Sequence, residues 1–224
     1  MTTKKRLLII RASKDICGNE LGLMSHQAEI LGMDVVSKNL SYGGQLDEVL
    51  NTETPYDYIY LCSHGCREGF EIHLENTSEQ EIMTWGNFAG VICENHAVAS
   101  NGILLLACCR GGMNAVATEM FICCPEIDYV CGPYSNVLPC DITTGFIVFL
   151  HSMETKRSEP AYAAIKASAA TDFTFKCFDR VEVETQVNYH IRKKEIEEDF
   201  SKEFEAINYL PNEFNYLRFN DRLF

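Results

Sequence analysis

The chain has 224 residues, 46% hydrophobic and 23% charged, which suits one large globular domain with a full core, or at most two small ones. Its formal net charge is −13, with 32 acidic residues against 19 basic ones. This balance disfavours nucleic acid and anionic membranes as partners, because both need clustered Lys and Arg, and we expect the acidity to serve solubility.

Strand and helix patterns alternate along most of the chain. Apolar runs predict six strands, at 5–12, 33–40, 56–64, 102–109, 128–135 and 173–183. Apolar residues at helical spacing predict helices at 21–32, 44–51, 84–97, 114–123, 140–155 and 159–170. A polar, turn-rich connection is expected at 65–82. The alternation predicts an α/β fold, a three-layer α/β/α sandwich around a mainly parallel six-stranded sheet, over residues 1–185.

The C-terminal segment, residues 186–224, has a different pattern. A charged helix is predicted at 190–210, and its apolar residues fall on one face. These residues are Ile196, Phe200, Phe204 and Ile207. A short aromatic tail follows Pro211. The favoured interpretation is a helix and tail packed on the domain, and a docking or regulatory element is the alternative.

The N-terminus and the cysteines indicate the compartment. Only four apolar residues precede Arg11, too few for a signal peptide, and no segment approaches the roughly 18 apolar residues of a membrane span. The eleven cysteines are odd in number, and several lie inside apolar runs, where free cysteine behaves as a small hydrophobe. We therefore expect a cytoplasmic protein. No zinc-type C-x-x-C pair occurs, and neither a metal at "CSHGC" (62–66) nor a cofactor is predicted.

Two predicted strands end in residues that can carry chemistry. The strand at 56–64 ends in His64, followed by Gly65, and the strand at 102–109 ends in Cys108 and Cys109. In open parallel sheets, reactive and binding groups collect at the carboxyl ends of the strands. If the two strands are neighbours, an imidazole and a thiol therefore meet at the same edge of the sheet.

A histidine beside a thiol suits nucleophilic catalysis. The imidazole raises the thiolate fraction and can later protonate the leaving amine. Gly65 allows a backbone N–H to approach a substrate carbonyl without a Cβ in the way. Together with the backbone amide of Cys109, that N–H would form an oxyanion hole.

These two strand ends resemble those of the caspase-like cysteine peptidases, the group of caspases, metacaspases, legumains, gingipains, separases and CHAT-domain proteases. "YIYLCSHG" is similar to the family's apolar strand ending Ser-His-Gly. "ILLLACCRGG" is similar to the strand ending Q-A-C-[RQG]-G, whose histidine lies about 50 residues upstream. His64 and Cys109 are 45 positions apart. The resemblance covers most of the chain and implies a caspase/flavodoxin-like fold and a cysteine endopeptidase with a Cys/His dyad and an acyl-enzyme intermediate.

The chain also departs from the caspase signature. Where the caspase signature has a glutamine and an alanine, this chain has Ala107 and Cys108. Only residues 111–127 separate the cysteine strand from the next predicted strand, and this short connection favours a single-chain protease. The choice of sulfur stays open. The patterns Cys-Arg-Gly and Cys-x-Ser-Gly select Cys109, which we favour, whereas Ala-Cys-x-x-Gly selects Cys108. Adjacent strand residues point to opposite faces, so only one of the two can face His64.

Substrate and partners are less constrained. The net acidity and Asp141 favour a basic side chain at the cleavage position, whereas Arg110, close to the site, argues for an acidic one. The resemblance implies a specific protein substrate, regulation by a sensor protein, and a homodimer through the edge strand at 173–183.

Two other functions remain as alternatives. One is a catalytically silent caspase-like domain that serves as a binding or scaffold module. The other is an unrelated flavodoxin-like binding or redox protein. The segment after the first strand, "RASKDICGNE", has a single glycine and does not support a nucleotide or flavin site.

Overall fold

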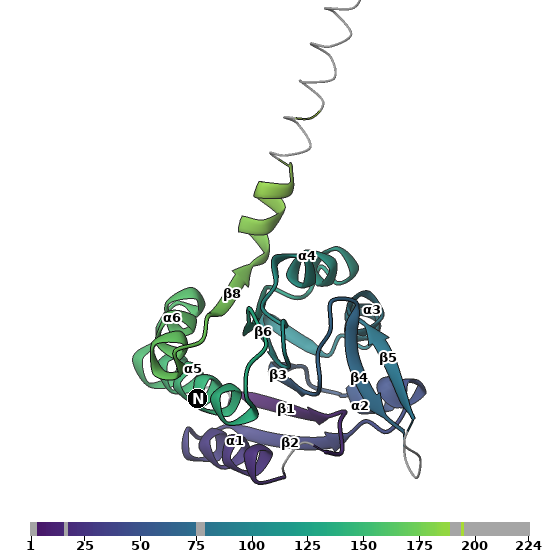
Figure 1. Ribbon diagram of the computed structural model, residues 1–224, viewed down its shortest axis with the longest axis horizontal. Coiled ribbons are helices and arrows are strands. Elements are labelled where there is room, and N and C mark those ends of the chain that lie inside the picture. The colour runs from purple at the N-terminus through teal and green to yellow at the C-terminus, as the bar shows by residue number, and fades with distance from the viewer. Residues whose placement is uncertain (1–3, 16–17, 75–78, 189–193, 195–224) are drawn as a thin grey trace, which may run out of the picture. The chain divides into compact units, whose positions relative to one another are not determined.

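Figure 1 shows the computed structural model of the chain, which describes residues 4–15, 18–74, 79–188 and 194. The strands are β1 (Arg6–Arg11), β2 (Asp34–Asn39), β3 (Tyr56–Cys62), β4 (Gly69–His73), β5 (Gln80–Thr84), β6 (Val98–Ala107), β7 (Tyr129–Pro133) and β8 (Phe175–Asp179). The helices are α1 (Gly18–Ile30), the 3-10 helix η1 (Gly43–Gln45), α2 (Leu46–Leu50), α3 (Trp85–Glu94), α4 (Asn114–Cys123), α5 (Pro139–Lys156) and α6 (Pro160–Thr171).

The chain divides into two compact units, Met1–Val183 and Glu184–Phe224. The division lies next to the boundary expected at 185/186. The predicted C-terminal helix and aromatic tail lie outside the described residues, apart from Lys194. None of the helices in the described part of the chain combines the length and apolar character that crossing a bilayer requires.

Six strands form one sheet in the order β2-β1-β3-β6-β7-β8. Neighbouring strands pair in parallel except β8, which runs antiparallel to β7. Helices α1, α5 and α6 cover one face, and α2, α3 and α4 cover the other (Figure 1). The predicted α/β/α sandwich with a mainly parallel six-stranded sheet is confirmed.

The central strands are apolar along their whole length because helices cover both of their faces. On one face, Tyr58 and Tyr60 pack with α5, where the Tyr60 and Phe146 rings meet edge to face at 5.5 Å. Successive strand residues point to opposite faces, so Ile59 and Leu61, both buried, face the other helix layer. Burying each such side chain contributes about 1.5–3 kcal/mol.

The expectation of a turn-rich connection at 65–82 was wrong for part of that stretch, which contains the antiparallel hairpin β4–β5. In β4 the apolar residues Phe70 and Ile72 alternate with polar ones, and both are fully buried. Phe70 packs against the rings of Trp85 and Phe88 in α3. Alternation over five residues, flanked by turn residues, is too short a signal to stand out in the sequence.

The last predicted strand, 173–183, is also shorter than expected. β8 ends at Asp179, and residues 180–188 are helical. The Asp179 side chain accepts a hydrogen bond from the Glu182 amide at 3.1 Å, as a helix N-cap residue does. A local cap therefore ends the strand where the apolar pattern alone would have continued it.

Candidate active site

The two strand ends singled out above are neighbours in the sheet. β3 pairs in parallel with β6, and Cys62 lies opposite Ala107. β6 ends at Ala107, so both Cys108 and Cys109 follow the strand instead of ending it. The register therefore brings His64 and the two cysteines together just beyond the carboxyl ends of the two strands.

Gly65 packs directly against the peptide backbone of the cysteine pair. A Cβ at this position would collide with the Cys109 carbonyl oxygen and would lie 3.0 Å from the Cys108 Cβ. Any side chain here would push the histidine segment away from the cysteines. The glycine is thus required for packing, in addition to the predicted access for a substrate.

The loop after the cysteines is held against the end of β7. The Gly112 amide donates to the Pro133 carbonyl at 2.9 Å, and a Cβ on Gly112 would collide with the Gly132 carbonyl. Arg110 has a φ of 64°, in the left-handed region, and its amide donates to the Ser135 carbonyl at 3.2 Å. These contacts fix the backbone that carries Cys109.

The two sulfurs lie in different surroundings. Cys108 is fully buried, and burial raises the pKa of its thiol well above its usual value. Cys109 is partly exposed, and its thiol donates to the Val137 carbonyl at 3.7 Å. Only Cys109 of the pair lines the small cavity that His64 also lines. The structure therefore brings His64 and Cys109 to one cavity and leaves Cys108 outside it.

This cavity, the thiol cavity, has a volume of about 120 Å³. Its lining is Glu20, Tyr60, Cys62, Ser63, His64, Ala107, Cys109, Val137, Pro139, Ile142 and Thr143. Its lining is mostly apolar, and Glu20 is the one acidic residue among these side chains. Burial, and then the negative charge of Glu20, raise the pKa of Cys62 to about 12. The Glu20 carboxylate is therefore close enough to influence a thiol in the wall of the cavity.

An acidic partner of His64 escaped the sequence analysis. The Asp15 Oδ2 lies 2.7 Å from the His64 Nε2. Burial opposes ionisation of Asp15, but hydrogen bonds from Ser13 and His64 and the nearby imidazole charges outweigh it, and the pKa falls to about 2. Because an ionised carboxylate can only accept, the proton at this contact sits on Nε2, and in the neutral imidazole the lone pair is then on Nδ1.

Asp15 could be found only with the strand order in hand. It follows β1 by four residues, and β1 is the neighbour of β3 in the sheet. The sequence places Asp15 and His64 49 positions apart, with no motif that joins them. Asp15 follows the carboxyl end of β1, so it fits the general tendency of functional groups in parallel sheets to lie at the carboxyl ends of the strands.

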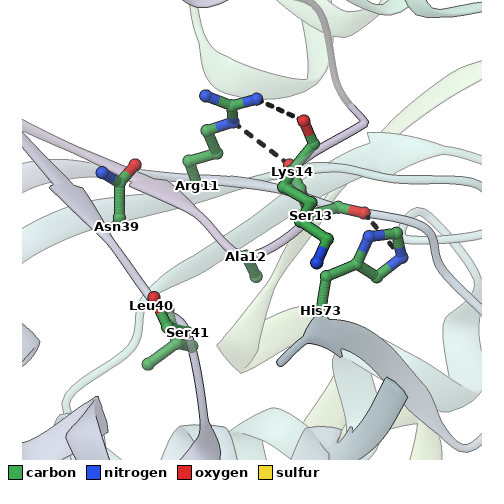
Figure 2. A pocket seen from close by; sticks show the side chains of 8 residues that line it. All are labelled: Arg11, Ala12, Ser13, Lys14, Asn39, Leu40, Ser41 and His73. Carbon is green, nitrogen blue, oxygen red and sulfur yellow. Dashed lines mark hydrogen bonds between the residues drawn. The ribbon is translucent and has the colours of Figure 1, made fainter. Parts of the chain in front are cut away.

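A second histidine, His73 at the end of β4, also contacts Asp15. Its Nδ1 is 3.6 Å from the Asp15 Oδ1, and its Nε2 is 3.1 Å from the Ser13 Oγ. The Ser13 hydroxyl donates to Asp15 at 2.6 Å. Figure 2 shows Ser13 and His73 pointing toward each other beside a polar cavity of about 510 Å³. Asp15, His64 and His73 are also the residues at this edge that could hold a metal ion.

The predicted oxyanion-hole amides are available. Within the part of the chain that the structure describes, neither the Gly65 N–H nor the Cys109 N–H donates to a protein acceptor. Of the two residues, Cys109 lines the thiol cavity. A backbone donor with no protein acceptor is suited to an oxygen supplied by a ligand.

The other predicted binding residues do not join this cavity. Asp141 lies in the first turn of α5, where its amide donates to the Leu138 carbonyl at 3.0 Å. Arg110 is exposed on the loop that follows Cys109. Neither side chain is among those that line the thiol cavity. Glu20, on α1, is instead the acidic residue in the lining of the thiol cavity.

No protein-family model and no curated protein matches this chain. The geometry of the site and the resemblance carried by its two strand ends are therefore what indicates a function.

Proposed function

We propose that this protein is a caspase-like cysteine endopeptidase with Cys109 as its nucleophile and His64 as its general base and acid. One observation carries the proposal: a histidine hydrogen-bonded through Nε2 to a carboxylate lines the same cavity as a partly exposed thiol. The neighbouring Cys108 is buried and held as the neutral thiol by that burial, which favours Cys109 as the nucleophile.

The reaction follows from the free nitrogen of His64. Its Nδ1 takes the proton of the Cys109 thiol, and the thiolate attacks the carbonyl carbon of the scissile peptide bond. The Gly65 and Cys109 amides donate to the oxyanion that forms. When the tetrahedral intermediate collapses, the C–N bond breaks and the leaving amine takes the proton from Nδ1. A water, deprotonated by Nδ1, then hydrolyses the thioester and frees the thiol.

Asp15 acts through His64 as a positioning residue. Its hydrogen bond to Nε2 fixes the orientation of the ring and the tautomer in which Nδ1 is the base. Its negative charge also stabilises the imidazolium that forms when Nδ1 takes up a proton. The Ser13 hydroxyl, which donates to the other carboxylate oxygen, holds Asp15 in place.

We propose that the substrate residue before the cleaved bond is basic. The thiol cavity has mostly apolar walls that suit the methylene groups of Lys or Arg, and Glu20 supplies a negative charge for the cationic end. The partner is accordingly a protein with an accessible basic residue. Among the described strands β8 is the edge of the sheet, so a second copy of the chain could extend the sheet there.

The test is cleavage of a peptide library that varies the residue before the scissile bond. We expect the wild type to cleave after Lys or Arg, Cys108→Ala to retain cleavage, and Cys109→Ala to lose it. Loss of cleavage in Cys108→Ala alone would overturn the assignment of the nucleophile. No cleavage, together with no labelling of any cysteine by peptidyl electrophiles, would favour the silent binding module instead.

A further inference from the structure

Three metal-ligating side chains converge from three separate segments at the carboxyl edge of the sheet. Asp15 follows β1, His64 follows β3, and His73 ends the hairpin strand β4. One donor atom from each lies within 4.8 Å of the other two. Two neutral imidazoles and a carboxylate are a donor set that binds Zn²⁺ and other divalent first-row transition ions.

The donor spacing suits such an ion. The Asp15 Oδ2 is 2.7 Å from the His64 Nε2, and the Asp15 Oδ1 is 3.6 Å from the His73 Nδ1. Ligand bonds of roughly 2.0–2.1 Å at tetrahedral angles place neighbouring donors about 3.3 Å apart. The two observed distances, which end on different oxygens of Asp15, lie on either side of that value. The three donor atoms lie within 4.8 Å of one another, so the side chains must shift toward one another to complete the coordination.

The outer nitrogen of His73 is already supported. The hydroxyl of Ser13 gives its one proton to Asp15, so it accepts from the His73 Nε2–H, 3.1 Å away. The Glu71 carboxylate oxygen, 3.7 Å from the same nitrogen, is a second acceptor. The Gln80 Nε2, 3.0 Å away, is an amide nitrogen that can only donate, so a proton on the His73 Nε2 requires the Gln80 amide to turn its oxygen toward the ring. Metal-binding histidines commonly donate their second N–H to such groups, which orients the ring and increases its basicity. In the tautomer that donates from Nε2 to Ser13, the Nδ1 of His73 has its lone pair toward Asp15.

Access to the site is open from one side. The His73 side chain is only 10% exposed, whereas those of His64 and Asp15 are 48% and 53% exposed. The buried His73 thus lies beneath His64 and Asp15, which solvent reaches. This arrangement leaves room for an ion to enter and for a water molecule to serve as its fourth ligand.

We propose that Asp15, His64 and His73 form a binding site for a divalent transition-metal ion such as Zn²⁺, and that occupancy of this site inhibits the peptidase. The inhibition rests on the proposed function, whereas the metal site does not. A neutral imidazole has one nitrogen lone pair to give. A metal on the His64 Nε2 uses it, the ring proton moves to Nδ1, and Nδ1 can no longer accept the proton of Cys109.

The metal site is tested by titrating the reduced full-length protein with Co²⁺ and following its visible absorption. We expect a d–d band from one ion per chain that is retained in Cys109→Ala and weakened at least about tenfold in apparent affinity in His73→Gln. Glutamine keeps a polar amide for the Ser13 contact, and circular dichroism checks that the variant is folded. His26→Gln, which removes an exposed histidine on α1, is the matched control and should bind as the wild type does.

Unchanged Co²⁺ affinity in His73→Gln would overturn the site. So would a sulfur-to-cobalt charge-transfer band that disappears in Cys109→Ala, because the ion would then be held by the thiol instead of by His73.

The inhibition is tested by the ratio of peptide cleavage in Zn²⁺ to cleavage in chelator, measured for each variant against its own basal rate. We expect a ratio of about 0.1 or less for the wild type and a ratio near one for His73→Gln. Adding chelator to the Zn²⁺-inhibited wild type should restore its cleavage rate. Equal inhibition of both proteins would contradict the proposed switch. Absence of cleavage by the wild type would contradict the proposed function and the inhibition together, while the Co²⁺ titration decides the metal site separately.

Discussion

His64 separates two regions of different character at the carboxyl edge of the sheet. On one side is the thiol cavity, small and mostly apolar, with Cys109 and Glu20 in its lining. On the other is a polar cluster in which Asp15 contacts Ser13, His64 and His73. In the proposed reaction, the apolar side holds the reacting bond, and the polar side orients His64 through its hydrogen bond to Asp15. One imidazole thus connects chemistry on one face with control on the other.

The largest expected effect lies on the thiol side. Cys109→Ala should lower kcat for peptide cleavage by at least about a thousandfold, because it removes the nucleophile. Cys108→Ala should leave kcat within a few-fold of the wild type and act on stability instead, since that side chain is fully buried. Steady-state cleavage and thermal unfolding of both variants separate the two effects. Comparable losses of kcat in both would contradict the division between the sulfurs.

On the polar side, Asp15→Asn should lower kcat by about a hundredfold or more with little change in KM, because the amide neither fixes the tautomer nor stabilises the imidazolium. The matched control is Asp141→Asn, an acid on α5 outside the thiol cavity, which should change neither constant. Their pH–rate profiles give a second readout, since loss of the carboxylate should move the limb that reports His64. An unchanged profile in Asp15→Asn would show that Asp15 has no part in positioning the base.

Gly65 packs against Cys108 and Cys109, and its replacement tests this close packing. Gly65→Ala should lower the free energy of unfolding by about 1–3 kcal/mol and reduce cleavage, because the new methyl group collides with the Cys109 carbonyl. Gly90→Ala, in α3 with nothing near the new Cβ, should be neutral or slightly stabilising. Chemical denaturation of the two variants makes the comparison, and equal stability would refute the close approach.

In the proposed reaction, Glu20 in the thiol cavity selects the substrate residue before the cleaved bond. Glu20→Gln should lower kcat/KM for peptides with Lys or Arg before the cleaved bond by about tenfold, since one tenfold step corresponds to 1.4 kcal/mol of lost charge pairing. Glu29→Gln, an exposed position on the same helix, serves as the control. If both variants keep the wild-type preference, the basic substrate residue is not recognised by Glu20.

The smallest effect concerns pH and stability. The folded-state pKa of Asp15, about 2, lies below its usual 3.8, so its contribution is fully present above pH 4 and is lost as the pH falls toward 2. The difference in unfolding free energy between wild type and Asp15→Asn should therefore shrink as the pH falls from 4 to 2. Denaturant unfolding at several pH values measures it, and a pH-independent difference would contradict the paired carboxylate.

The sheet and part of the candidate site could be predicted from the sequence, whereas other residues of the site could not. The buried strands have long apolar runs, so the alternation of strands and helices and the positions of His64 and Cys109 at strand ends could be read from pattern alone. Asp15 and His73 could not, because they meet His64 through strand order and through a hairpin whose apolar pattern spans only five residues. Glu20 was missed for a related reason: the packing of α1 beside α5 places it at the cavity, and that packing leaves no local motif.

The central claim is that Cys109 is a nucleophile activated by His64. Labelling with a peptidyl electrophile that carries a basic residue at the cleavage position, followed by mass-spectrometric mapping, tests it most directly. We predict that the wild type is labelled at Cys109 and not at Cys108, and that His64→Ala is labelled at least about a hundredfold more slowly at the same pH. Labelling at Cys108, or equal rates for wild type and His64→Ala, would contradict the account.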